Sequence, residues 1–538
     1  MADESDVGLV GEVRTVCDVI RTALGPFGAN KLLVGADGNV KTTASSTELL
    51  DSLDVDDPAV TLLSSTATGF RERHGDGAGS VVALVGALLT EAERLRERGL
   101  HPTAIEQGYR TGLERALATL DRTARPLDEY GPAAVARTAL TGTRDPSARG
   151  AVADQVAAAL ERLGDEVGTG DVGPGARDAI EVVSRTGGAA AETELVEGVV
   201  LDRNLTTPAM PRTPDRRGVA VLSSTVDVPT VGTELGRVSR RVELDVDSFE
   251  EREAVADYER SAFAEQLDAA VEAGCGAVFT EQAINERVES ELAARGVLGV
   301  DRLDADELRR VARATGATVV PTLEQVTAET LGDAAVRVER KAGRDMTFVT
   351  DGAGEAVYTL FCRAPDPRSA TAFERSVESA VAAAAAAVRD GRVVPGGGAA
   401  EATAAEAVRR EARSIPDRSQ LAAEAFGDAL MTVPRALGRT AGMDAWEAEI
   451  RLRVARSEDR DAVGVDALAG TTRDVLAEDP IVDPLPVKRA TLTAATDLAV
   501  QLVRIDERLS ATDLGDDAEG EEGMGPGPAG GAGRPNAD

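Results

Sequence analysis

Residues 75–95, GDGAGSVVALVGALLTEAERL, join a glycine-rich loop to a long apolar helix. Glycine allows backbone N–H groups to approach a phosphate closely, and a helix N-terminus adds partial positive charge. Asp76 lies inside the loop, where a carboxylate can hold Mg²⁺ against phosphate oxygens. The stretch lacks the GxxxxGK(S/T) pattern of a P-loop, so it indicates a phosphate site of another kind.

Two further glycine-rich turns lie at helix ends. They are Leu24-Gly25-Pro26 and Pro395-Gly396-Gly397-Gly398. Taken singly, each of the three loops is explained as well by an ordinary turn between helices. Only their order and surroundings along the chain, considered below, can change that weighing.

Outward from these loops, the spacing of apolar residues predicts helices at both ends of the chain and an α/β module between them. Predicted helices lie near 7–24, 60–70, 81–98 and 103–120, in the interval 126–188, and again from 370 onward, with a hairpin at 31–43. In the middle, predicted strands near 198–205, 218–223, 277–280, 297–300 and 318–321 alternate with helices near 248–273, 285–295 and 305–315. The outline is an α+β, multidomain chain with an inserted middle module.

The amino-acid composition excludes some classes of function. The chain has 538 residues, with 59 Lys and Arg against 93 Asp and Glu, and its net charge is −34. Phosphate neutralisation needs basic surface, so we expect no nucleic-acid partner. Such acidity favours a salt-adapted cytoplasm, in which counter-ions screen the carboxylates, although an acidic protein from a GC-rich genome would also show it.

The cysteine and histidine content argues against a zinc site, a multi-histidine metal centre and a disulfide framework. Cys17, Cys275 and Cys362 are far apart, and the two histidines are His74 and His101. There is no secretory signal pattern at the start and no apolar run long enough to span a bilayer, so we expect a cytoplasmic protein without a membrane partner. Trp446 is predicted to lie in the core.

Taken in order, several segments resemble group II chaperonins, the thermosome family, and point to a divergent haloarchaeal-type member. These segments are TALGPFGANKLLV (22–34), LDVDDPAV (53–60), residues 75–95, HPTAIEQGYRTGLERAL (101–117), AMPR (209–212), ERSVESAV (374–381), GRVVPGGGAAE (391–401) and VDPLPVKRATLTAATDLAVQLVRIDERL (482–509). Any one of them is moderately specific, but the ordered set is highly specific.

The resemblance implies a fold of three domains. A helical equatorial domain would comprise residues 1–128 and 390–514, and an intermediate domain residues 129–198 and 353–389. Residues 199–352 would form an α/β apical domain that binds substrate, with a helical protrusion over Arg241–Glu265 serving as lid. Residues 515–538, rich in glycine and acid, would be a disordered tail.

The resemblance also implies ATP and Mg²⁺ as ligands. Asp76 would hold Mg²⁺ and Glu378 would be the catalytic carboxylate. The residues that would bind ATP are Leu24, Gly25, Pro26, Asp76, Gly77, Ala78, Gly79, Ser80, Gly397, Asp466 and Asp483.

The chain departs from the family pattern at positions that bear on hydrolysis. Ser45 stands where the family has an Asp thought to assist hydrolysis, and Ala78 and Gly79 replace two hydroxyl residues. Glu378 is taken to replace the catalytic Asp of the intermediate-domain helix. Losing one general base typically costs about 10²–10⁴ in rate. We therefore expect ATP binding with slow or absent hydrolysis, unless Glu378, helped by Glu48, substitutes adequately.

The function that follows is an ATP-binding subunit of a double ring that encloses unfolded proteins and assists their folding. The ring could be homo-oligomeric or mixed with other chaperonin subunits. The alternative is a non-hydrolysing structural subunit that co-assembles with active paralogues. A metabolic NTPase is disfavoured because the sequence carries no substrate-specific constellation.

Overall fold

The computed structural model divides the hydrophobic core into three large clusters, each with its own set of helices and strands. The structure describes residues 6–35, 38–53, 55, 57–141, 145–168, 172, 175–203, 205–224, 261, 263–341 and 343–505. Of the predicted protrusion only residues 261 and 263–265 fall in these ranges, and they are helical. The predicted tail, 515–538, lies outside them.

The first cluster is helical and combines both ends of the chain. Its N-terminal helices are α1 (Asp6–Arg21), α2 (Ser46–Ser52), α3 (Pro58–His74), α4 (Ala78–Glu97) and α5 (Pro102–Thr123). Its C-terminal helices are α13 (Ala399–Ala412), α14 (Ser419–Leu430), α15 (Thr432–Thr440), α16 (Ala445–Ser457) and α17 (Leu485–Val503). The apolar helix α4, predicted from the glycine-rich stretch, packs against α1, α14 and α17 at the centre of this cluster.

The helical unit also contains several short strands. The hairpin β1 (Lys31–Val34) and β2 (Val40–Thr43) is antiparallel, as the sequence predicts. A three-stranded sheet in the order β17-β14-β3 joins Val482–Pro484, Arg392–Pro395 and Arg125–Pro126. A second hairpin pairs β15 (Val463–Asp466) with β16 (Thr471–Asp474). The sheet matters for the site because it places Val394 directly opposite Asp483.

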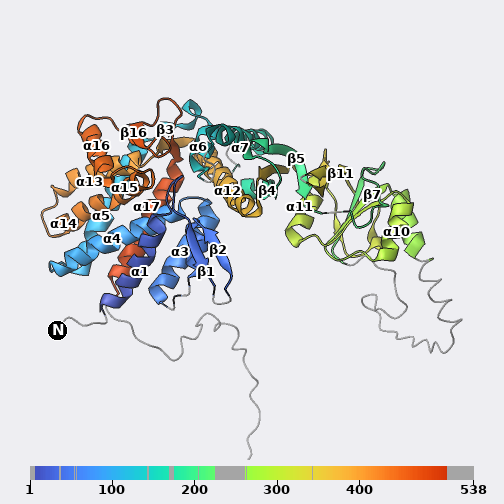
Figure 1. Cartoon of the computed structure of the whole chain (residues 1–538), viewed down its shortest axis with the longest axis horizontal. Coiled ribbons are helices and arrows are strands. Elements are labelled where there is room, and N and C mark those ends of the chain that lie inside the picture. Colours follow the sequence, from blue (N-terminus) through green and yellow to red (C-terminus); the bar gives the residue numbers. More distant parts are fainter. Residues whose placement is uncertain are drawn as a thin grey trace, which may run out of the picture.

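The second cluster lies in the middle of the molecule (Figure 1) and again unites two distant pieces of chain. Its helices are α6 (Pro132–Ala139), α7 (Pro146–Val167), α8 (Gly175–Ala179) and α12 (Pro367–Asp390). The adjoining sheet has the order β11-β12-β5-β13-β4, formed by Ala335–Lys341, Arg344–Thr350, Glu194–Leu201, Tyr358–Ala364 and Ile180–Thr186.

One strand of that sheet corrects the sequence analysis. Residues 126–188 are predicted to be helical, but Ile180–Thr186 form strand β4. β4 pairs in parallel with β13, so that Tyr358 faces Ile180. Its partner lies almost 180 positions away in the sequence, and the β-branched run IEVV becomes a strand because that partner is available. A local pattern cannot reveal this.

The third cluster is contiguous in sequence and forms the inserted α/β module. Its sheet has the order β10-β6-β7-β8, with β9 also paired to β6; the strands are Gly332–Asp333, Gly218–Leu222, Cys275–Thr280, Leu298–Val300 and Val319–Val320. Apart from β10 the pairings are parallel, as expected where helices cross between strands. Two helices, α10 (Glu286–Ala294) and α11 (Ala305–Thr315), cover it close to their predicted bounds. The α+β, multidomain fold is confirmed.

Candidate functional site

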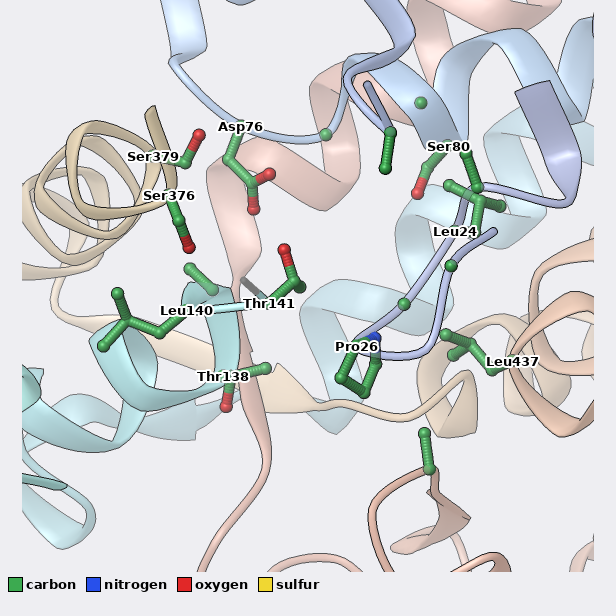
Figure 2. Close-up of a pocket in the computed structure, with 18 of the residues that line it drawn as sticks. Leu24, Pro26, Asp76, Ser80, Thr138, Leu140, Thr141, Ser376, Ser379 and Leu437 are labelled. Carbon is green, nitrogen blue, oxygen red and sulfur yellow. The ribbon is translucent and has the colours of Figure 1, made fainter. Parts of the chain in front are cut away.

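The glycine loops from both chain ends face a single cleft of about 1970 Å³ (Figure 2). Every residue predicted to bind ATP lines it, namely Leu24, Gly25, Pro26, Asp76, Gly77, Ala78, Gly79, Ser80, Gly397, Asp466 and Asp483. Ligand pockets usually measure ~300–1,000 Å³, so a nucleotide and its hydration fit with room to spare. The structure thus brings these residues together, while their role in binding stays a prediction.

The loop between α3 and α4 forms one wall of the cleft. Helix α3 ends at Gly75, and Gly77 occupies the N-cap of α4 with a left-handed φ of 93°. A Cβ on Gly77 would come within 3.1 Å of the Thr491 hydroxyl and 3.2 Å of Val487. No described side chain caps α4 at Gly77, so backbone N–H groups of its first turn remain available for an anionic ligand.

The loop between β14 and α13 repeats this arrangement on another wall. Gly397 has φ 60°, and Gly398, at the N-cap of α13, has φ 76°. A Cβ on Gly397 would lie 2.3 Å from the carbonyl oxygen of Val465, a backbone atom that cannot move aside. The close approach of the two backbones therefore requires glycine at this position.

A buried ion triad closes the inner end of the cleft. Lys488 Nζ, on α17, lies 2.6 Å from Glu401 Oε1 and 3.0 Å from Asp483 Oδ2. Burial alone would lower the pKa of Lys488, but the charges of Asp483 and Glu401 outweigh it and raise the pKa above the usual value. Lys488 is therefore protonated, and its positive charge neutralises part of the negative charge of the two carboxylates.

Asp76 lies beside this triad and is suited to hold a divalent cation. Burial raises its pKa, and the charge of Asp483 raises it further, against the opposing effects of the Gly77 amide and Lys488. A desolvated carboxylate of this kind gains by binding Mg²⁺. The described residues contain no cluster of three or more His, Cys, Asp or Glu that could hold a metal by itself, so the ion would also need phosphate oxygens and water.

Helix α12 presents hydroxyl groups to this end of the cleft. Ser376 and Ser379 line the cleft; Figure 2 shows Ser379 directed to the side of Asp76, and Ser379 Oγ donates a hydrogen bond to the Gly75 carbonyl at 3.2 Å. The structure does not bring Glu378 into the cleft. Its side chain is half exposed, and Glu378 Oε2 lies 3.7 Å from an Arg71 guanidinium nitrogen. Neighbouring positions on a helix are about 100° apart, which is why Ser379 faces inward and Glu378 outward.

Ser45 and Glu48, the other two positions that bear on hydrolysis, lie at the start of helix α2. Ser45 caps α2 and accepts a hydrogen bond from the Glu48 amide. Glu48 is buried and is bound by Lys41, Thr43 and Arg375. Burial would raise the pKa of Glu48, but these partners together lower it, so Glu48 is ionised and engaged. It links α2 to α12 instead of presenting a free carboxylate.

Sequence reasoning missed the contribution of α6 to the cleft. Thr138, Leu140 and Thr141, at the end of this helix, line the side opposite the glycine loops (Figure 2). Thr138 also accepts a hydrogen bond from the Val482 amide at 3.2 Å. The sequence offers only two threonines near each other as a signal for these residues, and no helix end is predicted there.

Asp466 marks the far end of the cleft. Its carboxylate accepts hydrogen bonds from the Ala469 amide at 3.0 Å and from Arg473 Nε at 2.7 Å. These bonds hold the turn between β15 and β16, whose residues line this side of the cleft.

Two helix N-termini without a side-chain cap and a nearby carboxylate have the chemistry that suits a phosphorylated ligand, and they lie in a multidomain α+β protein. The chain belongs to the TCP-1/cpn60 chaperonin family, whose family model matches residues 16–513. It is 34% identical to a thermosome subunit of Methanopyrus kandleri over 505 residues, covering 93% of this chain and 91% of that protein. It is 33% identical to thermosome subunit alpha of Halobacterium salinarum over 513 residues, covering 95% and 89%. The predicted resemblance is confirmed.

None of the described helices is both long enough and apolar enough to span a bilayer.

Proposed function

We propose that the chain is an ATP-binding chaperonin subunit that assembles with other subunits into a double ring and assists the folding of unfolded proteins inside it. Membership of the chaperonin family supports this function. The proposal that the chain binds ATP rests on one observation: Asp76, Gly397 and Asp483 converge on a single cleft. ATP and Mg²⁺ are the ligands that its donor set fits.

In this proposal, the three core clusters act as equatorial, intermediate and apical domains with the predicted boundaries. The cleft lies between the helical unit of both chain ends and helices α6 and α12 of the middle unit. A ligand that contacts both units binds most tightly when they are close together. Nucleotide binding would therefore favour a closed arrangement of the domains, with the middle unit carrying the movement to the apical module.

We further propose that this subunit binds ATP but hydrolyses it slowly. Hydrolysis needs a carboxylate to orient or deprotonate the attacking water. Beside Asp76, helix α12 offers the hydroxyl groups of Ser376 and Ser379, and Asp483 is paired with Lys488. The expected loss from a missing general base is about 10²–10⁴ in rate.

Adjacent positions on α12 allow a direct test. Isothermal titration should show ATP binding by the wild type, and a phosphate-release assay should show slow turnover. The double variant Ser45→Asp/Ser379→Asp places carboxylates at the two cleft positions, and Asp remains a good N-cap for α2. It should raise kcat about 100-fold with little change in ATP affinity. Glu378→Gln, its outward-facing neighbour, is the matched control and should leave turnover unchanged.

Two results would reject the weakened-hydrolysis proposal. One is wild-type turnover as fast as that of the double variant. The other is loss of turnover in Glu378→Gln, which would restore Glu378 as the catalytic carboxylate. Absence of ATP binding would reject the function as a whole. A chain that enters rings only beside a paralogue, without turnover, would instead match the structural-subunit alternative.

A further inference from the structure

Arg473, on β16, ties together the wall of the cleft beside Asp466. Its Nε donates a hydrogen bond to Asp466 Oδ2 at 2.7 Å. Its Nη1 donates to the carbonyl oxygens of Asp474 and Glu478 at 2.9 and 2.7 Å, and its Nη2 donates to that of Asp479 at 2.8 Å. One guanidinium group thereby connects the β15–β16 hairpin to the chain that follows it.

The segment that Arg473 holds, residues 477–481, is neither helix nor strand, and all of it lines the cleft. Asp479 has a φ of 50°, a left-handed conformation that is unfavourable for a residue with a Cβ. Such a conformation persists where the surrounding contacts fix it. The hydrogen bond from Arg473 to the Asp479 carbonyl is one of these contacts, and the Gly396 amide, which donates to the Ile481 carbonyl at 2.8 Å, anchors the other end of the segment.

This wall adjoins the phosphate end of the cleft but differs from it in chemistry. The phosphate end has the N-termini of α4 and α13, whereas the wall at Arg473 presents the apolar side chains of Leu468, Pro480 and Ile481. Burial would raise the pKa of Asp466, but the hydrogen bonds from Arg473 and from backbone amides lower it, so the carboxylate is ionised and paired. Apolar side chains beside polar groups that already have partners suit the flat ring of a nucleobase.

We propose that Arg473 is a positioning residue for the nucleoside half of the bound nucleotide. It acts through the turn at Asp466 and the segment 477–481, which it holds at the spacing that base and ribose require. The inference rests on the proposed ATP binding and adds to it. Lysine cannot replace Arg473 in this role, because one ammonium group cannot reach a carboxylate and three carbonyl oxygens as the planar guanidinium does.

Calorimetric titration of the full chain with Mg-ATP and with Mg-tripolyphosphate separates the two halves of the site. In Arg473→Met, ATP should bind at least about 10-fold more weakly, as expected for the loss of a hydrogen bond from a charged group, whereas tripolyphosphate should bind as it does to the wild type. Arg473→Lys keeps the charge and should lose a similar ATP affinity. Arg460→Met, which removes an exposed arginine paired with Glu458, is the control and should keep both affinities.

A measurement on the wild type does not depend on how the variants fold. In hydrogen exchange, ATP should protect the amides of residues 466–481 more than tripolyphosphate does. Both ligands should protect the loops at Gly77 and Gly397 to the same extent. Equal protection of residues 466–481 by the two ligands would show that the nucleoside lies elsewhere, and the inference would be wrong.

The remaining failures are distinguishable. If the wild type does not bind ATP, the proposed function fails and this inference falls with it. If the wild type binds ATP and Arg473→Met binds it equally well, only the inference falls. It also falls if tripolyphosphate binding weakens by the same factor as ATP binding, or if Arg473→Lys restores the wild-type affinity, since Arg473 would then act through its charge. Failure of tripolyphosphate to bind the wild type would overturn it as well, because the phosphates would then have no site independent of the wall.

Discussion

Replacing Lys488 by methionine removes the cation that lies between two carboxylates at the inner end of the cleft. Lys488 and Glu401 are 15% and 4% exposed, and Asp483 is 21% exposed, so water can replace little of the lost interaction. Breaking a buried ion pair from one side costs about 3–5 kcal/mol. The equilibrium for opening this region should therefore rise about 10²- to 10⁴-fold.

Hydrogen exchange followed by mass spectrometry can measure this opening in α13 and α17. The measurement is made at pH 8, where Lys488 of the wild type is protonated because Asp483 and Glu401 raise its pKa above the usual value.

The chain offers a matched control in Lys341. Its Nζ lies 3.1 Å from Glu194 Oε1, but the two side chains are 32% and 46% exposed. Lys341→Met should cost no more than about 1 kcal/mol. The predicted role of Lys488 is refuted if the amides of α13 and α17 in Lys488→Met exchange at pH 8 as they do in the wild type, or if Lys341→Met loses as much protection.

Three further predictions concern the cleft and the surface. Gly397→Ala places a Cβ 2.3 Å from the Val465 carbonyl oxygen at a residue with left-handed φ. The variant should lose at least about 1–2 kcal/mol of folding stability and should bind ATP more weakly in titration. Gly38→Ala is the control, because a Cβ there meets no neighbouring atom and costs only the strain of a left-handed φ. Because burial and Asp483 raise the pKa of Asp76, Mg²⁺ affinity in the presence of ATP should begin to fall at a higher pH than for an ordinary aspartate, and Asp76→Asn should abolish this dependence in calorimetry. The net charge of −34 should make the melting temperature rise from low salt to molar KCl; equal melting at both would exclude salt adaptation.

The glycine loops could be predicted from sequence because their chemistry is local. Gly77 and Gly397 each precede a helix and have positive φ. Such positions favour glycine, so the sequence itself indicates them. The order of helical and α/β segments was likewise visible in the apolar spacing. In the inserted module, α11 runs from Ala305 to Thr315 as predicted, since its Asp304 cap and apolar period agree.

The sequence could not predict which way particular side chains face or which distant segments pair. Glu378 and Ser379 are neighbours, and only the packing of α12 against the loop at Gly75 decides which one faces the cleft. Strand β4 needs its distant partner β13 to be recognised. Trp446 has a large apolar side chain of the kind usually found in a core, but it lies on the surface of the single chain. Each of these facts depends on packing between parts of the chain that are remote in sequence.

The discontinuous core of the helical unit has a consequence for biosynthesis. Its buried residues run from Val13 to Leu120 and then resume at Val394, so the two halves cannot meet until nearly the whole polypeptide has left the ribosome. The α/β core spans Val199 to Val357 without such a gap and can be completed earlier. The apolar faces of α1 to α5 therefore lack their C-terminal partners for most of translation, and exposed apolar surface of this kind is prone to aggregation.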